Sequence, residues 1–324
     1  MGCWPLWIPF LQRNNTVKRD LLTLADVTPD EIGQMLTLSL DLKQRYKRGE
    51  STSLLAGKSL VLLFSKPSLR TRASFEVGMA QLGGHTSCFE DPEIVLGLRE
   101  PIKDLGRVLS RYYDGIVIRT FAHASVVELA QAATIPVING LTDMFHPCQI
   151  LAALQTLQEH FGELKGRRIA YVGDGNNVAH SWLLGAAQMG LTLTVACPRA
   201  YQPDMTVVRR ARAIAETTGA VLDIVEDPKQ GVKGADAIYT DVWASMGQEQ
   251  EAAIRQEVFR PYQINAALLA EAPSHAVVMH CLPAHRGEEI TEDVFESARS
   301  LVFEEAENRL HAQKALLVFA MIGL

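Results

Sequence analysis

Short apolar runs alternate with longer amphipathic stretches along almost the whole chain. Eight of the runs have strand length and a nearly continuous apolar character, as buried parallel strands do: residues 59–64, 114–119, 135–138, 168–173, 191–196, 221–225, 235–240 and 276–280. Helical periodicity is clearest over residues 71–82, 101–113, 147–161, 178–189, 204–218 and 302–321. This alternation predicts an α/β fold of parallel sheets flanked by helices.

The 324 residues are enough for two such units, because a single hydrophobic core seldom grows beyond about 250–300 residues. A loop-like segment at 139–146 lies near the middle of the chain. We therefore expect two doubly wound domains joined by interdomain helices. The expected units are a poorly ordered extension over 1–17, a first domain over 18–146, a second domain over 147–305, and a C-terminal helix over 306–324 that completes the first domain.

The composition narrows the classes of function. A net charge of -6 and a pI of about 5.9 argue against a nucleic-acid-binding surface, so an anionic ligand must be held by a few well-placed arginines. The five cysteines form no C-x-x-C pair, which favours a reducing, cytoplasmic setting over a disulfide framework or zinc ribbon. No apolar run has membrane-spanning length, and the apolar first residues lack the basic region of a secretory signal.

The clearest anion-binding pattern follows the run 59–64. Residues 65–76 (SKPSLRTRASFE) lead from a predicted strand through a polar loop into a helix. Amides and the dipole at a helix N-terminus attract anions, the hydroxyls of Ser68 and Thr71 add donors, and Arg70 can grip a phosphate with two hydrogen bonds. The alternative is a basic helix start that Ser68 merely caps.

Two further polar groups belong to the same sheet edge. Arg119 ends the predicted strand 114–119, and His146 and Gln149 open the helix predicted over 147–161. The carboxyl ends of parallel strands are where ligands bind in open α/β sheets. A histidine at a helix start is more often structural, but convergence with the phosphate loop favours a ligand-binding role here.

Residues 173–177 (GDGNN) follow another predicted strand and open a helix, as a dinucleotide-binding motif would. The third glycine of that motif is replaced by Val178, and the next strand ends without the acidic residue that a ribose requires. The sequence therefore disfavours nucleotide binding.

Asp241 lies at the end of the run 235–240, where a carboxylate can pair with an ammonium group; the alternative is a helix cap. His280 and Cys281 end the last strand. Adjacent strand residues point to opposite faces, which disfavours a Cys–His nucleophile. A zinc site built from His280, Cys281 and His285 lacks the usual ligand spacing.

Together these segments resemble a known family. Residues 68–72 (SLRTR) resemble the S-T-R-T-R loop, and residues 146–149 (HPCQ) the H-P-x-Q motif, of the aspartate and ornithine carbamoyltransferases. The resemblance extends in order from about residue 18 to the C-terminus. Residues 241–247 (DVWASMG) and 280–283 (HCLP) are similar to the ornithine-specific branch.

The resemblance implies two substrate sites. The carbamoyl-phosphate site would comprise Ser68, Leu69, Arg70, Thr71, Arg119, His146, Gln149, Cys281, Leu282 and Arg309. The ornithine site would comprise Asn177, Asp241, Ser245 and Met246. The catalytic residues would be Arg119, His146, Cys281 and Arg309. Leu69 stands where the family usually has Thr, so the phosphate loses one hydroxyl but keeps a backbone amide.

The implied reaction is a direct attack of the ornithine δ-amine on carbamoyl phosphate, with the oxyanion held by arginine and histidine donors and without metal or cofactor. The implied partners are the two small substrates and identical subunits, in a trimer or a multiple of trimers. The family's loop corresponding to 91–99 usually offers a polar side chain to a neighbouring subunit, but Ile94, Val95 and Leu96 are apolar. Two alternatives remain: a sister enzyme acting on putrescine or acylated ornithine, and a non-catalytic binding protein.

Overall fold

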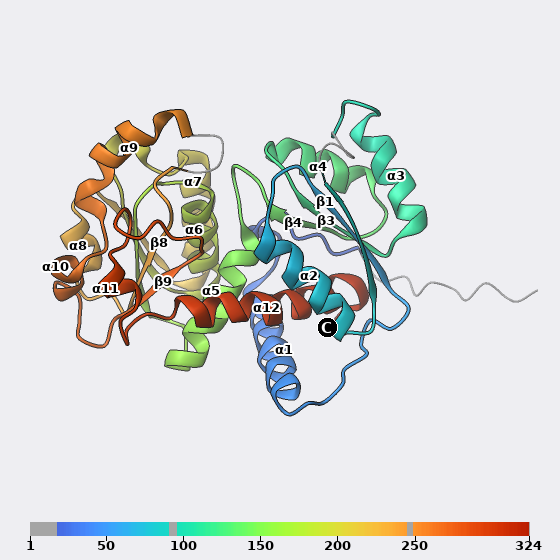
Figure 1. Cartoon of the computed structure of the whole chain (residues 1–324), viewed down its shortest axis with the longest axis horizontal. Coiled ribbons are helices and arrows are strands. Elements are labelled where there is room, and N and C mark those ends of the chain that lie inside the picture. The colour runs from blue at the N-terminus through green and yellow to red at the C-terminus, as the bar shows by residue number, and fades with distance from the viewer. Residues whose placement is uncertain (1–17, 91–95, 245–248, 324) are drawn as a thin grey trace, which may run out of the picture.

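The computed structural model describes residues 18–90, 96–244 and 249–323. It contains two parallel sheets side by side, each between layers of helices (Figure 1). The first sheet has the order β2-β1-β3-β4 and the second β7-β6-β5-β8-β9. The strands of the first sheet are β1 (Ser59–Phe64), β2 (His85–Glu90), β3 (Gly115–Arg119) and β4 (Val137–Leu141). Those of the second are β5 (Arg168–Val172), β6 (Thr192–Ala196), β7 (Val221–Val225), β8 (Ala237–Thr240) and β9 (Val277–His280).

Helices connect the strands in both halves. Those before β5 are α1 (Pro29–Lys47), α2 (Leu69–Gln81), α3 (Ile102–Tyr112), α4 (His123–Ala132) and α5 (Pro147–Phe161). The later ones are α6 (Asn177–Met189), α7 (Met205–Thr218), α8 (Pro228–Val232), α9 (Ala252–Phe259), α10 (Ala266–Ala270), α11 (Glu292–Phe295) and α12 (Val302–Ile322). Short 3-10 turns lie at Leu24–Asp26, Arg199–Tyr201, Glu249–Glu251 and Arg260–Tyr262.

Alternate residues of each strand enter different layers of the core, because successive side chains on a strand point to opposite faces. In β1, Val61 and Leu63 pack with α3 and α4, whereas Leu60 and Leu62 pack on the opposite face with α1, α2 and α12. Both faces of each sheet are covered, which explains why the strands read as continuous apolar runs.

One apolar cluster runs through both halves. It includes Leu60 of the first sheet, Tyr171 of the second, and residues of α5, α6 and α12 between them. Figure 1 shows α5 and α12 crossing from one half to the other, and the two helices pack against each other. The C-terminal helix also packs against α1 and α2. The two sheets are therefore held on a shared helical layer.

The predicted parallel sheets and flanking helices are confirmed, with two local corrections. Strand β2 was not predicted, because it is a half-exposed edge strand of mixed composition. The segment 139–146 is not loop throughout. Strand β4 extends to Leu141, and the side chain of Asn139 is buried and donates to the carbonyl of Leu22 at 2.9 Å. The side-chain nitrogen of a buried strand residue can thus find its hydrogen-bond acceptor in a distant segment.

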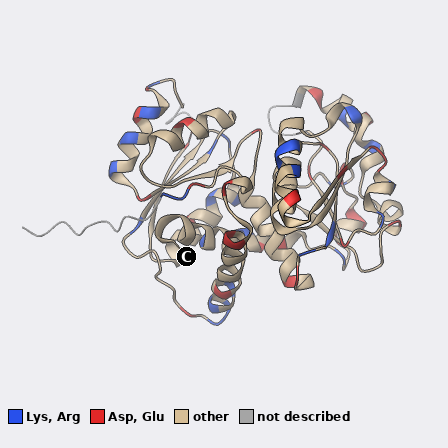
Figure 2. Cartoon of the chain, turned by 180° about the vertical axis from the view of Figure 1, so that it is seen from behind, with Lys and Arg blue, Asp and Glu red and all other residues tan. Residues whose placement is uncertain are grey.

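The surface and helices add two general facts. Basic and acidic residues both occur over the two halves in Figure 2, so charge is not gathered into a face of one sign in that view. Within the described part of the chain, every helix is too short or too polar to cross a lipid bilayer.

Candidate active site

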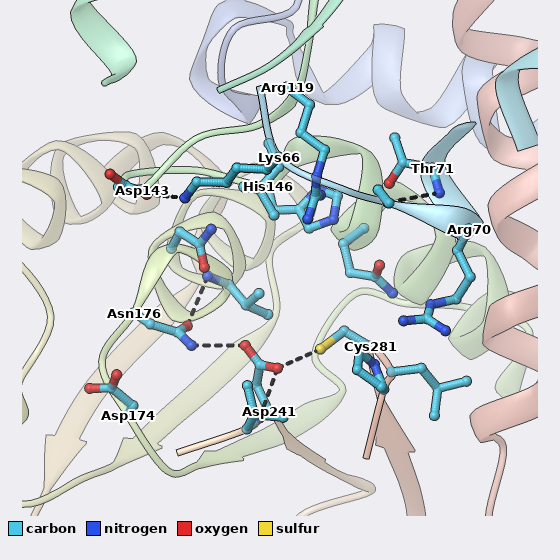
Figure 3. A pocket seen from close by; sticks show the side chains of 18 of the residues that line it. Lys66, Arg70, Thr71, Arg119, Asp143, His146, Asp174, Asn176, Asp241 and Cys281 are labelled. Carbon is cyan, nitrogen blue, oxygen red and sulfur yellow. Dashed lines mark hydrogen bonds and ion pairs between the residues drawn. The ribbon is translucent and has the colours of Figure 1, made fainter. Parts of the chain in front are cut away.

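A cavity of about 830 Å³ is lined by loops from both halves, at the carboxyl ends of both sheets (Figure 3). Its walls are the segments that follow β1, β3, β4, β5, β8 and β9, together with Arg309 of α12. The structure brings together here Ser68, Leu69, Arg70, Thr71, Arg119, His146, Gln149, Asn177, Asp241, Cys281, Leu282 and Arg309. Ser245 and Met246, and also Ile94 and Val95, lie outside the described residues.

The loop after β1 starts α2 as the sequence predicts. Ser68 is the N-cap residue, and its hydroxyl accepts a 3.3 Å hydrogen bond from the amide of Thr71. The capping role that was considered for Ser68 is therefore correct. It is compatible with ligand binding, because a hydroxyl that accepts one hydrogen bond can still donate another. The side chain of Leu69 is 80% exposed.

The two arginines of this helix differ in environment. Arg70 lines the cavity beside Thr71, its neighbour in the chain (Figure 3). Arg72 does not line it and instead forms ion pairs with Glu76 (3.0 Å) and Glu90 (2.8 Å). Of these two arginines, only Arg70 is therefore available to an anion in the cavity.

Arg119, His146 and Arg309 form a buried basic group beside Arg70. Burial, followed by repulsion from Arg309 and Arg70, lowers the pKa of Arg119 to about 10. Burial and the same kind of repulsion hold the pKa of His146 well below its usual value, so its imidazole is neutral. Arg119 Nε and His146 Nδ1 have no hydrogen-bond partner within the described residues. Buried like charges with unused polar atoms favour an anionic ligand.

Gln149 lies between two charged residues of α12. Its Nε2 donates to Glu305 Oε1 at 2.6 Å, and its Oε1 accepts from Arg309 Nη1 at 2.5 Å. Arg309 Nη2 also donates to Thr71 Oγ1 at 3.1 Å. Glu305 was not singled out from the sequence. Its position four residues before Arg309 on the same predicted helix was a usable signal.

The opposite wall of the cavity is acidic. Asp241, just after β8, accepts hydrogen bonds of 2.8 Å from Cys281 Sγ and from Asn176 Nδ2. It also accepts from the amide of Val242 at 2.8 Å, and no helix begins there, so it is not a helix cap. Burial and the Asp241 carboxylate raise the pKa of the Cys281 thiol well above its usual value. Cys281 is therefore a neutral hydrogen-bond donor to Asp241.

The start of α6 joins this wall to the first half. Asn176 caps the helix, accepting from the amides of Val178 and Ala179. Asn177 Nδ2 donates to the carbonyl of Thr142 at 2.6 Å, and Ser181 Oγ accepts from the amide of His146 at 2.7 Å. Sequence reasoning chose Asn177 but missed Asn176, which contacts Asp241 directly.

Two family models match consecutive parts of the chain. The carbamoyl-P binding domain of aspartate/ornithine carbamoyltransferase matches residues 19–159, and the Asp/Orn binding domain of the same family matches residues 165–320. The chain belongs to the aspartate/ornithine carbamoyltransferase family. It is thus an enzyme of the carbamoyltransferase class.

Relatives and solved structures agree with this assignment. The ornithine carbamoyltransferase of Anoxybacillus flavithermus is 53% identical over 300 residues, which are 93% of this chain and 96% of that protein. The one from Pyrococcus horikoshii is 50% identical over 306 residues, or 94% and 96%. The structure of ornithine carbamoyltransferase from Pyrococcus furiosus superposes with a TM-score of 0.92 at 49% identity and covers 95% of this chain and 100% of that one.

The geometry explains why this carbamoyltransferase carries a glycine-rich turn after β5. A Cβ added to Gly175 would lie 2.4 Å from the nitrogen of Pro203 and 2.5 Å from the carbonyl oxygen of Tyr201. The glycine therefore permits close approach of another loop, and the Asn176 side chain occupies the helix-start amides that a pyrophosphate would use. Both facts agree with the exclusion of nucleotide binding.

His280 is engaged on both ring nitrogens. Nδ1 accepts from the amide of Leu282 at 2.9 Å, so Nε2 donates to Glu289 at 3.0 Å. Cys281 Sγ also lies 3.9 Å from Nδ1, although the two residues were expected to point to opposite faces; the amide of Leu282 takes the lone pair that would activate the thiol. Leu282 has a φ of 57°, a conformation that is rare for leucine and concentrates at functional sites.

An ion pair that sequence reasoning missed also lines the cavity. Arg255 Nη1 donates to Asp174 at 2.9 Å and to the carbonyl of Trp243 at 2.9 Å, and both charged side chains are buried. Burial raises the pKa of Asp174 to about 6, although Arg255 acts in the opposite direction. The 81 residues that separate the pair left no sequence pattern to reveal it.

Proposed function

We propose that the chain transfers the carbamoyl group of carbamoyl phosphate to the δ-amine of L-ornithine, giving L-citrulline and phosphate. The observation that carries this proposal is the pairing of opposite walls. Arg70 and Arg119 lie on one side of the cavity and Asp241 on the other (Figure 3). Arg309 belongs to the arginine side, because it donates to Thr71 Oγ1 at 3.1 Å. An anion and an amino acid can bind there face to face.

The phosphate end would bind at the start of α2. Ser68 and Thr71 supply hydroxyls, Leu69 supplies a backbone amide, and Arg70 supplies a guanidinium. Charge-assisted hydrogen bonds are roughly twice as strong as neutral ones, so Arg70 contributes most of the affinity. Placing the phosphate here directs the carbamoyl group towards Arg119 and His146.

The carbamoyl group would be held by Arg119, His146, Gln149 and Arg309, with Cys281 and the Leu282 carbonyl close by. Attack by the δ-amine forms a C–N bond and places a negative charge on the carbonyl oxygen. Preorganised donors at that oxygen stabilise the transition state, and removing one such donor typically lowers kcat by about 10²–10³. Collapse breaks the C–O bond to phosphate, which leaves with the electron pair and accepts the proton from the amine.

The acceptor would bind through its α-amino and α-carboxylate groups, near Asp241, Asn177, Ser245 and Met246. Asp241 pairs with the α-ammonium group. The protonated Cys281 and the Leu282 carbonyl orient the δ-amine, which must be neutral to attack. Putrescine lacks the α-groups and would leave Asp241 without its partner.

We also propose the division of labour along the chain: residues 18–146, completed by the C-terminal helix, bind carbamoyl phosphate, and residues 147–305 bind ornithine. The packing of α12 on α1 and α2 supports the first assignment, although α12 begins at Val302 and not at residue 306. We further propose a homotrimer or a multiple of trimers. Light scattering in solution would then give a mass three times the 35.7 kDa of one chain, or a multiple of that value.

The proposed function is tested by citrulline formation from carbamoyl phosphate and L-ornithine. Putrescine, N-acetylornithine and N-succinylornithine are assayed beside it. We expect kcat/KM to be at least 100-fold higher with ornithine. A preference for any of the other acceptors would replace the proposed substrate, and the absence of carbamoylation of all four would overturn the activity.

A further inference from the structure

Glu305 is a fully buried acid that directly adjoins the cavity residues without lining the cavity itself. Its Oε1 accepts two hydrogen bonds, one from Tyr239 Oη at 2.7 Å and one from Gln149 Nε2 at 2.6 Å. Its Oε2 has no partner within the described residues. Burying a carboxyl group in this position costs free energy, because one of its oxygens loses its hydrogen bonds to water and gains no hydrogen bond in the protein.

The hydrogen bond from Gln149 to Glu305 helps to hold the side-chain amide of Gln149 in one orientation. The oxygen and nitrogen of an amide side chain have similar size, so only hydrogen-bond partners distinguish the two orientations. Arg309 offers donors alone, and Glu305 Oε1 acts as an acceptor. Both partners therefore favour the same orientation, with the oxygen of Gln149 towards Arg309 and its nitrogen towards Glu305.

That orientation also fixes Arg309. Its guanidinium donates to Gln149 Oε1 and to Thr71 Oγ1, which lies at the start of α2. Glu305 and Arg309 are four residues apart on α12 and so lie on the same face of the helix. A continuous chain of hydrogen bonds therefore connects Tyr239 in β8 to Thr71 in α2 through Glu305, Gln149 and Arg309.

We propose that Glu305 is a positioning residue for carbamoyl transfer, which holds Gln149 and through it Arg309 in the orientation that receives the carbamoyl group. This inference rests on the proposed function of the cavity. It assigns to Glu305 an effect on turnover, with little effect on ornithine binding, because Asp241 lies on the opposite wall.

A purely apolar or structural need would not select an acid at this position. An apolar side chain of similar volume would fill the space without desolvating a carboxyl group. Such a replacement of a buried charged group is often neutral or stabilising. The acid supplies an acceptor that Gln149 and Tyr239 both use. The required property is therefore the acceptor and not the charge.

The first test compares Glu305→Leu with Glu305→Gln. The leucine removes the acceptor of Gln149 Nε2 and leaves the amide held at its oxygen alone, so we expect kcat to fall by about 10- to 100-fold, in the range caused by mispositioned groups. The ornithine KM should change by less than about threefold. Glutamine keeps a carbonyl acceptor and should recover most of kcat. Glu304→Leu, at an exposed position one residue away on the same helix, is the matched control and should leave kcat unchanged.

A charge exchange keeps the test valid if the leucine variant fails to fold. Gln149→Glu alone places two carboxyl groups against each other and should reduce kcat strongly. Adding Glu305→Gln restores one donor and one acceptor between the two side chains and gives the same total charge as the wild type. The double variant should have a kcat at least tenfold higher than that of Gln149→Glu alone. Wild-type kcat in Glu305→Leu, or no recovery in the double variant, overturns the inference. A wild-type enzyme that forms no citrulline overturns the proposed function itself.

Discussion

The thiol of Cys281 donates a 2.8 Å hydrogen bond to the carboxylate of Asp241, which joins the ends of β9 and β8. Burial and this carboxylate raise the pKa of the thiol well above its usual value. Because the thiolate is the reactive form, we predict that iodoacetamide reacts far more slowly with Cys281 than with the thiol of free glutathione at pH 8. Peptide mass spectrometry measures the rate, and Asp241→Asn should accelerate it. Labelling of the wild-type residue as fast as that of glutathione would contradict the assignment.

Asp241 should also control acceptor affinity. Truncating one partner of a buried charge pair costs roughly 2–5 kcal/mol, so we predict that Asp241→Asn raises the ornithine KM on the order of 100-fold or more. The KM for carbamoyl phosphate should change little, because that substrate binds at the opposite wall. Steady-state kinetics with each substrate varied in turn provides the measurement. Equal rises in both KM values would point to a general disturbance of the cavity.

Arg70 and Arg72 form a matched pair for testing the phosphate site. They lie on the same helix, but only Arg70 lines the cavity, whereas Arg72 pairs with Glu76 and Glu90. Losing hydrogen bonds to a charged group costs roughly 1.5–3 kcal/mol each. We predict that Arg70→Ala raises the KM for carbamoyl phosphate on the order of 100-fold, and that Arg72→Ala changes it less than about fivefold. The reverse order would exclude Arg70 as the phosphate ligand.

The buried ion pair between Arg255 and Asp174 should stabilise the folded protein. Removing Arg255 leaves the Asp174 carboxylate buried without a charged partner, which typically costs about 3–5 kcal/mol. We predict this loss in the free energy of unfolding for Arg255→Gln, measured by urea titration at pH 7. The loss for Asp174→Asn should be smaller, because Arg255 keeps its 3.0 Å ion pair with Glu251. The double variant should be less unstable than the sum of the two. Strict additivity would show that the two side chains do not interact.

Glu305 should make folding stability depend on pH. Burial raises its pKa from 4.5 to about 7, so the folded state binds a proton that the unfolded state has already released between these values. Its contribution to stability is complete below pH 4.5 and is lost as the pH rises through 7. At about 1.4 kcal/mol for each pKa unit, the change amounts to about 3 kcal/mol.

Glu305→Gln removes this dependence. The stability of this variant relative to the wild type should therefore increase between pH 4.5 and pH 8 by up to about 3 kcal/mol. Denaturant unfolding of both proteins at several pH values measures the difference. Parallel curves for the two proteins would show that Glu305 does not titrate in this range.

Much of the fold could be predicted from the sequence, because buried parallel strands and amphipathic helices have distinct periods. The run 59–64 and the helix over 147–161 have the bounds in the structure that were predicted. Strand β2 was missed because an edge strand carries polar residues. Strand β4 was cut short at residue 138 because Asn139 and Gly140 are typical of a turn. The carbonyls of Leu22 and Phe145 accept from the Asn139 side chain and so make it acceptable in a strand.

The candidate site divides in the same way. Arg70, Arg119 and Asp241 could be found because each follows a strand, and the carboxyl ends of parallel strands meet at one edge. The partners of these residues could not be found. Asn176 beside Asp241, Glu305 beside Gln149 and Arg255 beside Asp174 come from segments whose proximity has no local pattern.

By itself the sequence determined the two-sheet α/β architecture, the family and many of the side chains that line the cavity, because periodicity and local motifs are properties of neighbouring residues. The tertiary structure alone decided the protonation of Cys281 and His146, the orientation of Gln149 and the role left for Glu305. These properties depend on burial and on charges brought together across tens or hundreds of residues. Local sequence does not contain that information.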